Sequence, residues 1–218
     1  MKKLLIILYF LFLTACTPIQ SMLDSTVIVT GYSNGVFVSQ GSGVVTEHGI
    51  LTAGHVVRNT DTIKVEYRDG SKEEVTLEKI HMEHRGNTIT YDIALLNNNS
   101  SKHLQQKIQC NPVNIQDEVF VVGHPHNMSW VMTRGRITSI HPRTNQKENT
   151  WIHTDAVFTR GSSGGPVFSK SGQIIGIISH MDMMQTQRSF VPSGFGFAVS
   201  GKEICKFLGI KEERKPHL

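Results

Sequence analysis

The chain has 218 residues, of which 39% are hydrophobic, enough for a globular protein with its own core. Its 19 glycines against only 7% aromatic residues indicate many turns and therefore β-rich structure. The formal charge of +4 falls to +2 without the lysines at 2–3, since 20 basic then face 18 acidic residues. No later run of Lys or Arg exceeds two and no RNA- or DNA-binding motif is present, which argues against nucleic acid as a partner.

The N-terminal segment has the pattern of a targeting sequence. Two lysines precede the apolar run 4–13, which is too short to span a bilayer comfortably. The run ends in Leu-Thr-Ala-Cys, which resembles a bacterial lipobox. We therefore predict that residues 1–15 are a lipoprotein signal peptide and that Cys16 is acylated. An ordinary signal peptide or a signal anchor is the alternative.

Acyl chains on Cys16 would hold the protein on a membrane, and stable anchoring takes two or more chains. Residues 16–24 are then expected to be a short polar tether, because they show little periodicity and include Pro18. Thr17 stands where lipoprotein sorting would read an Asp, which favours the outer membrane if the source is diderm. The expected location is the bacterial cell envelope.

Short apolar or alternating segments separated by turn residues make up the rest of the chain. The expected strands of the first half, about 25–105, lie at 25–32, 35–40, 42–46, 49–52, 62–67, 73–80 and 93–96. We read these seven segments as six short strands, with Asn34-Gly35 as a hairpin turn. The second half, about 115–200, has six more, at 118–123, 130–140, 151–158, 165–169, 174–179 and 195–199.

The expected fold class is therefore all-β, with one short C-terminal helix at 201–208. Two sets of six strands could form two barrels or one large sandwich. No repeat or low-complexity segment favours either arrangement.

One stretch, Gly161-Ser162-Ser163-Gly164-Gly165-Pro166, carries the chemistry. A hydroxyl at a tight, Gly-rich bend is accessible, and the glycines leave room for another molecule to approach the main chain. Serine alone is a poor nucleophile and needs a base and an orienting acid. Upstream, Thr-Ala-Gly-His ends at His55, and Asp-Ile-Ala-Leu-Leu begins at Asp92.

Each motif alone is more typical of a turn or a strand start, since Gly and Ser are ordinary turn residues. Together and in this order, they resemble the trypsin-like serine protease family, most closely its Deg/HtrA branch. The resemblance covers the chain from Gly35 to about Phe207 and leaves no room for the PDZ module that often follows. It implies two six-stranded antiparallel β-barrels with the catalytic groups at their junction, and residues 25–218 as one protease domain.

The resemblance also implies the roles of single residues. Ser163 would be the nucleophile, His55 the base and Asp92 the group that orients the imidazole. The main-chain N–H groups of Gly161 and Ser163 would form the oxyanion hole. Relatives commonly carry Asn or Asp where Ser162 stands, and the lack of an acid there argues against activation through a new charged N-terminus.

The same resemblance places a specificity pocket. Val157 would form its base. Ser179, His180 and Met181 would form the wall that pairs with substrate, and Gly194 and Gly196 would form the opposite wall. No charge sits at Val157, so we expect cleavage after small or medium apolar residues, because a buried cation would lack a partner.

Cysteines and histidines complete the expectations. The family's connector between barrels runs close to its final helix, so a Cys110–Cys205 disulfide is implied, with two buried thiols as the alternative. No cofactor or metal is expected: the three cysteines lack C-x-x-C spacing, and His81/His84 and His124/His126 lack a third ligand. The function expected is an exported, lipid-anchored serine endopeptidase acting on polypeptides; the alternative is a catalytically silent binding module.

Overall fold

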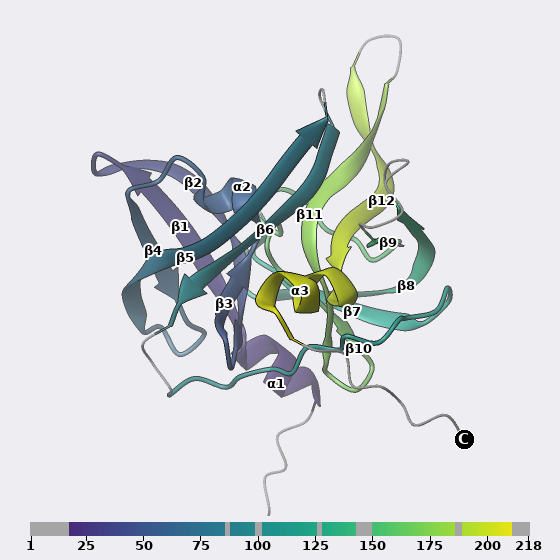
Figure 1. Ribbon diagram of the computed structural model, residues 1–218, viewed down its shortest axis with the longest axis horizontal. Helices are drawn as coiled ribbons and strands as arrows, with labels where there is room; N and C mark the ends of the chain where they lie inside the picture. Colours follow the sequence, from purple (N-terminus) through teal and green to yellow (C-terminus); the bar gives the residue numbers. More distant parts are fainter. Residues whose placement is uncertain are drawn as a thin grey trace, which may run out of the picture.

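The computed structural model describes residues 18–85, 88–98, 102–125, 128–142, 150–185 and 189–210. Two closed barrels follow one another along the chain, each made of six antiparallel strands (Figure 1). The first has the order β1-β2-β3-β6-β5-β4 and the second β10-β11-β12-β9-β8-β7. The predicted fold class is confirmed.

The strands of the first barrel are β1 (Thr26–Ser33), β2 (Val36–Thr46), β3 (Gly49–Thr52), β4 (Thr62–Glu66), β5 (Lys72–Arg85) and β6 (Thr88–Asn97). Those of the second are β7 (Glu118–Gly123), β8 (Val131–Pro142), β9 (Thr150–Thr154), β10 (Pro166–Ser169), β11 (Ile174–Gln185) and β12 (Phe190–Ser200). The described helices are α1 (Pro18–Asp24), α2 (Gly54–Val57) and α3 (Gly201–Leu208).

Each barrel closes around its own buried side chains, and a third cluster joins the two. Val27, Ile50 and Leu96 belong to the core of the first barrel, and Val121 and Ile178 to that of the second. The third cluster contains buried residues from both barrels, among them Leu51, Tyr91, Val122 and Trp151. The junction between the barrels is therefore packed, and groups on its two sides are held in fixed relative positions.

The predicted turn at Asn34-Gly35 joins β1 to β2, and both residues have positive φ, 51° and 77°. The expected break after Gln40 does not occur, because 35–40 and 42–46 are parts of the single strand β2. Gly41 lets this strand pass close to the second barrel: a Cβ there would lie 2.7 Å from the main-chain O of Ser163.

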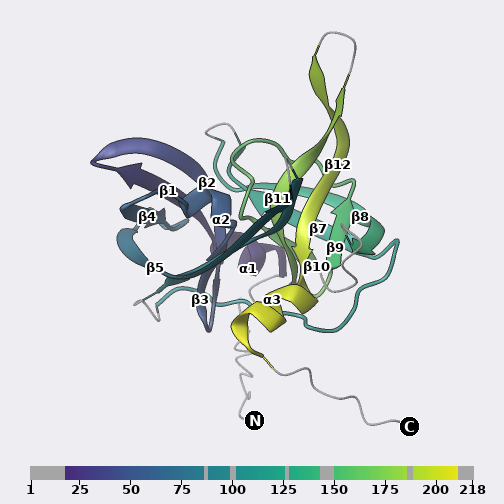
Figure 2. The same ribbon diagram turned by 45° about the horizontal axis from the view of Figure 1, so that its top comes forward.

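Other boundaries also differ from the expectation. The segment 151–158 forms a strand only as far as Thr154. Strand β11 continues past its expected end to Gln185, and β12 begins before its expected start, at Phe190. These two strands project together beyond the second barrel (Figure 1) and extend from it in the turned view as well (Figure 2).

Residues 18–24, expected to be part of a polar tether, form the helix α1 instead. Met22 from this helix is 1% exposed and belongs to the cluster between the barrels. Burial of one methionine stabilises a helix whose few apolar residues gave no periodic signal. The predicted signal peptide and Cys16 lie outside the described residues.

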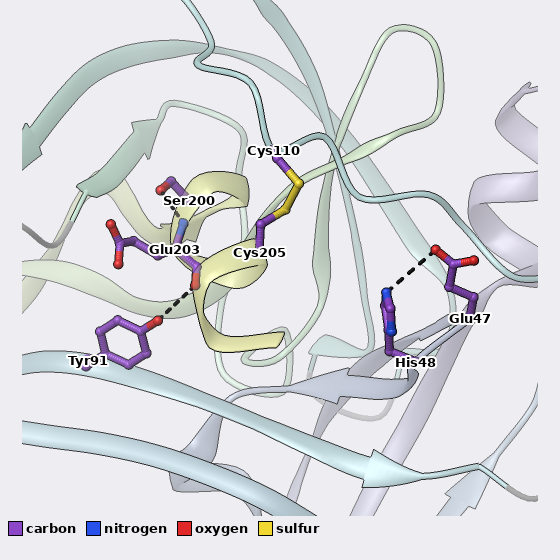
Figure 3. Close-up of a disulfide and its surroundings, with 7 residues drawn as sticks. All are labelled: Glu47, His48, Tyr91, Cys110, Ser200, Glu203 and Cys205. Atoms are coloured by element: carbon purple, nitrogen blue, oxygen red, sulfur yellow. Dashed lines mark hydrogen bonds and ion pairs between the residues drawn. A yellow bond between two sulfur atoms is a disulfide. The ribbon is translucent and has the colours of Figure 1, made fainter. Parts of the chain in front are cut away.

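Helix α3 agrees with the expected 201–208 and is capped at both ends. Ser200 accepts a hydrogen bond from the Glu203 amide, and Gly209 ends the helix with φ 74°. A disulfide joins Cys205 on α3 to Cys110 in the connector between the barrels, with a Cα–Cα distance of 5.7 Å (Figure 3). The Tyr91 hydroxyl donates to the Glu203 main-chain O, so α3 is tied to both barrels.

Within the described ranges, no helix is long and apolar enough to cross a bilayer.

Candidate active site

His55 and Asp92 meet on the first barrel. His55 lies on the single-turn helix α2, directly after β3, and Asp92 lies on β6 and is fully buried. The Nδ1 of His55 is 2.7 Å from Oδ2 of Asp92, and the His55 amide donates to Oδ1 at 2.9 Å. The carboxylate thus holds both the ring and the backbone of His55.

Asp92 is kept ionised although it is buried. Burial raises the pKa of its carboxyl, but the hydrogen bond and charge of His55, together with the Ser179 hydroxyl and the His55 amide, outweigh burial and lower it. The carboxylate therefore accepts all of its hydrogen bonds. An ionised partner at Nδ1 stabilises an imidazolium, so His55 can take up a proton at its other nitrogen.

Ser163 reaches the same place from the second barrel. It lies in the turn between β9 and β10, and its hydroxyl donates to the main-chain O of Ser179 at 3.2 Å. The Ser179 hydroxyl in turn donates to Oδ2 of Asp92. Ser179 thus contacts both Ser163 and Asp92, while no hydrogen bond in the described chain joins Ser163 to His55. Rotation of the Ser163 hydroxyl away from Ser179 would be needed to make one.

The turn before Ser163 exposes main-chain donors. Gly161 and Gly164 have φ values of 95° and 84°, in the region that favours glycine. A Cβ on Gly161 would lie 2.4 Å from the main-chain O of His124, and one on Gly164 would lie 2.2 Å from that of Ser42. In the described part of the chain, the amides of Gly161 and Ser163 have no hydrogen-bond acceptor. Both are available to a developing oxyanion.

Two residues that the sequence analysis missed support this turn. The Ser42 amide donates to the Ser163 main-chain O at 2.8 Å, and its hydroxyl donates to the Gly161 main-chain O at 2.8 Å. The His124 amide donates to the Ser42 hydroxyl at 3.0 Å. A link from β2 to the serine turn therefore fixes one barrel against the other at the site.

The side chain of His124 completes this link. Its Nδ1 lies 3.1 Å from the Ser42 hydroxyl, whose proton is already donated to Gly161, so Nδ1 carries a hydrogen. Nε2 is buried and has no hydrogen-bond partner within the described chain. Burial lowers the pKa of His124 to about 4, so the ring is neutral at pH 7.

The sequence does not indicate this support, because Ser42 and His124 are 82 residues apart. The sequence predicts no metal site at His124 and His126 and places Ser42 in a strand. Ser162, which precedes Ser163 in the turn, is 2% exposed. The described residues contain no cluster of three metal-ligating side chains, although His126 and the His84 side chain fall outside them.

A cavity of about 250 Å³ lies beside the serine turn. It is lined by Ala156, Val157, Phe158, Thr159, Met181, Gly194 and Phe195. Three of the predicted pocket residues are thus on its wall: Val157, Met181 and Gly194. The lining contains no charged side chain.

The other predicted pocket residues lie around this cavity rather than on its lining. Ser179 is buried against Asp92, and His180 packs on Phe197. A Cβ on Gly196 would lie 1.6 Å from the Phe158 ring, so Phe158 occupies the space that glycine leaves. Phe158 therefore makes the cavity apolar and narrows it, a role that the sequence did not indicate.

Comparisons with known proteins agree with this arrangement. A family model described as trypsin-like peptidase domain matches residues 41–177. A probable periplasmic serine endoprotease, DegP-like, from Buchnera aphidicola is 31% identical over 150 residues, which cover 66% of this chain and 31% of that protein. The periplasmic serine endoprotease DegP of Escherichia coli is 29% identical over 148 residues, covering 65% and 30%.

The fold comparison points the same way. The crystal structure of the serine endoprotease from Yersinia pestis superposes with a TM-score of 0.69 at 25% identity, covering 88% of this chain and 64% of that one. The chain spans about a third of the length of the curated relatives above. These findings confirm the resemblance to the Deg/HtrA branch.

Proposed function

The chain belongs to the trypsin-like peptidase family, and we propose that it is a serine endopeptidase in which Ser163, His55 and Asp92 form the catalytic triad. The observation that carries the proposal is the link between these residues at the barrel junction: Asp92 is hydrogen bonded to His55, and Ser179 contacts both Asp92 and Ser163. His55 is held by an ionised, buried Asp92, and two main-chain amides of the Ser163 turn have no hydrogen-bond acceptor among the described residues.

Each group has a step in peptide hydrolysis. The Ser163 hydroxyl turns from the Ser179 main-chain O toward His55, which takes its proton as Ser163 attacks the carbonyl carbon. The imidazolium is stabilised by Asp92 and then gives the proton to the leaving amine. The Gly161 and Ser163 amides donate to the carbonyl oxygen as it becomes negative, and each such donor contributes about 3 kcal/mol. Water, activated by His55, then releases the acyl group from Ser163.

We propose that small or medium apolar side chains enter the cavity beside this turn. Val157, Phe158 and Met181 present apolar side chains to this cavity. A lysine or arginine would be desolvated in this lining without an anionic partner. The preference is therefore for residues such as Val, Ala or Leu at the cleaved bond.

Digestion of an unfolded protein and of a peptide library tests both the peptidase activity and the preference for apolar residues. Wild type should cleave, mainly after apolar residues, and Ser163→Ala should not, although it keeps the same fold and thermal midpoint. Ser162→Ala is the matched control, because it removes the hydroxyl of the residue next to Ser163 and leaves Ser163 in place. Binding of the unfolded protein without cleavage would instead favour a silent binding module. Dominant cleavage after Arg or Lys would contradict the proposed preference while leaving the activity in place.

We also propose that the enzyme is lipid-anchored in the bacterial envelope through Cys16. The support is the lipobox-like Leu-Thr-Ala-Cys after a charged and apolar leader. The DegP relatives named above are periplasmic proteins, which is consistent with an envelope location. Labelled palmitate should be incorporated by wild type and not by Cys16→Ser. Equal labelling of both would contradict the anchor.

A further inference from the structure

A second histidine is connected to the triad from the far side of Asp92. His180 lies on β11 next to Ser179, and its Nδ1 is 2.9 Å from the Ser179 hydroxyl. That hydroxyl donates to Oδ2 of Asp92, the same oxygen that faces Nδ1 of His55. Two histidines are thus linked through one serine and one carboxylate.

An irregularity in β11 makes this contact possible. Adjacent residues of a regular strand point to opposite faces, so neighbouring side chains do not meet. In the pairing of β11 with β12, Ile178 faces Ala198 and His180 faces Phe197, which leaves Ser179 as an extra residue between them. Such a bulge redirects side chains. It brings the Ser179 hydroxyl and the His180 ring to the same side.

Counting protons fixes the direction of each hydrogen bond. Asp92 is ionised and can only accept, so the single hydroxyl hydrogen of Ser179 is donated to it. Ser179 then has only lone pairs to offer His180. Nδ1 of His180 must therefore carry a hydrogen and donate it. The chain of donation runs from His180 to Ser179 to Asp92, and it ends on the carboxylate that orients His55.

Aromatic neighbours hold the His180 ring in this orientation. The ring stacks on Phe197 at 4.8 Å with an interplanar angle of 15°, and Trp151 meets its edge at 5.5 Å. His153 packs on Phe197 at 4.1 Å. The ring is thus fixed by packing and does not depend on the hydrogen bond alone for its position.

We infer that His180 is a positioning residue of the peptidase: its Nδ1–H fixes the Ser179 hydroxyl on Asp92, and through Asp92 it sets the orientation of His55. The inference rests on the proposed function. It differs from the role that the sequence suggested for His180, a wall that pairs with substrate, because that role uses the main chain and does not depend on the side-chain donor.

Two substitutions separate the effect of the His180 Nδ1–H donor from the effect of the packing of its ring. His180→Phe keeps an aromatic ring to stack on Phe197 but cannot donate to Ser179. His180→Asn loses the ring but places an amide N–H near the position of Nδ1. The readout is the rate at which a small fluorophosphonate labels Ser163, because this probe needs an activated serine and does not occupy the extended substrate cleft.

Loss of one supporting hydrogen bond should slow labelling about fivefold in His180→Phe. His180→Asn should recover most of the lost rate, although it is the less similar side chain. With peptide substrates, the Phe variant should lower kcat and leave KM nearly unchanged. In a Ser179→Ala background, His180→Phe should cause no further loss, since the donor then has nothing to hold.

The possible results are distinct. Equal labelling of wild type and His180→Phe, equal slowing in the Phe and Asn variants, or a rise in KM alone would each overturn the role of His180 while leaving the triad intact. A folded wild type that fluorophosphonate does not label would overturn the proposed peptidase as well. Thermal midpoints of all variants identify any that are not folded.

Discussion

Protonation of His124 should weaken the fold as the pH falls. The ring is 1% exposed, and burial lowers its pKa from 6.5 to about 4. In the unfolded chain this histidine takes up a proton near pH 6.5, whereas in the folded protein it resists protonation until about pH 4. The stability that depends on neutral His124 is therefore complete above pH 6.5 and is lost progressively down to about pH 4.

The size of the stability loss follows from the shift in the pKa of His124. Each pKa unit corresponds to about 1.4 kcal/mol, so a fall from 6.5 to about 4 amounts to about 3 kcal/mol when the titration is complete. The structural reason is that a second proton would be placed on Nε2, which has no acceptor in the described chain. In the folded protein, the Ser42 link to Gly161 should loosen only near pH 4, where His124 takes up its proton.

His124→Asn tests this reasoning. Its amide can still donate to Ser42 but cannot titrate. Urea unfolding of both proteins, in a Ser163→Ala background that prevents self-digestion, gives the free energy of unfolding at about pH 7 and about pH 4.5. The Asn variant should be less stable at pH 7 because it leaves a cavity. Wild type should nevertheless lose about 2–3 kcal/mol more than the variant on acidification.

Equal losses in the two proteins would refute the assignment of this pH dependence to His124. Acidic residues contribute to the pH dependence of the unfolding free energy in both proteins. The difference between the two proteins therefore tests the assignment to His124.

Three further predictions concern other parts of the chain. The disulfide between Cys110 and Cys205 closes a loop across 95 residues, so reduction should lower the free energy of unfolding by about 4 kcal/mol; the double Ser variant should not respond to reductant. Asp92→Asn should lower kcat about a thousandfold or more, because an amide cannot stabilise the His55 imidazolium; loss below tenfold would contradict its role. Val157→Asp should shift cleavage toward Lys and Arg, and an unchanged library profile would remove Val157 from the specificity pocket.

Much of the barrel architecture could be predicted because it depends on local patterns. Asn34-Gly35 is a turn sequence whose positive φ values few other residues tolerate, and the structure has a hairpin there. Helix α3 carries its own caps at Ser200 and Gly209. The motifs around His55, Asp92 and Ser163 predict these residues as a triad, although no sequence pattern states how far apart they lie.

The missed elements depend on tertiary contacts. Helix α1 owes its burial to Met22, which fills space between barrels that the local sequence cannot specify. Strand β2 passes through a polar stretch that resembles a loop, and it stays extended because Ser42 is hydrogen bonded to the serine turn. The support from His124 was equally hidden, since its partner is 82 residues away in sequence.

The central claim is that Ser163 is an activated nucleophile at the barrel junction. Mass spectrometry of the protein after fluorophosphonate treatment at neutral pH tests it most directly. We expect one covalent adduct, located on Ser163 and lost when His55 is replaced by Ala. A folded protein that carries no adduct, or one modified on Ser162 with Ser163 untouched, would contradict it.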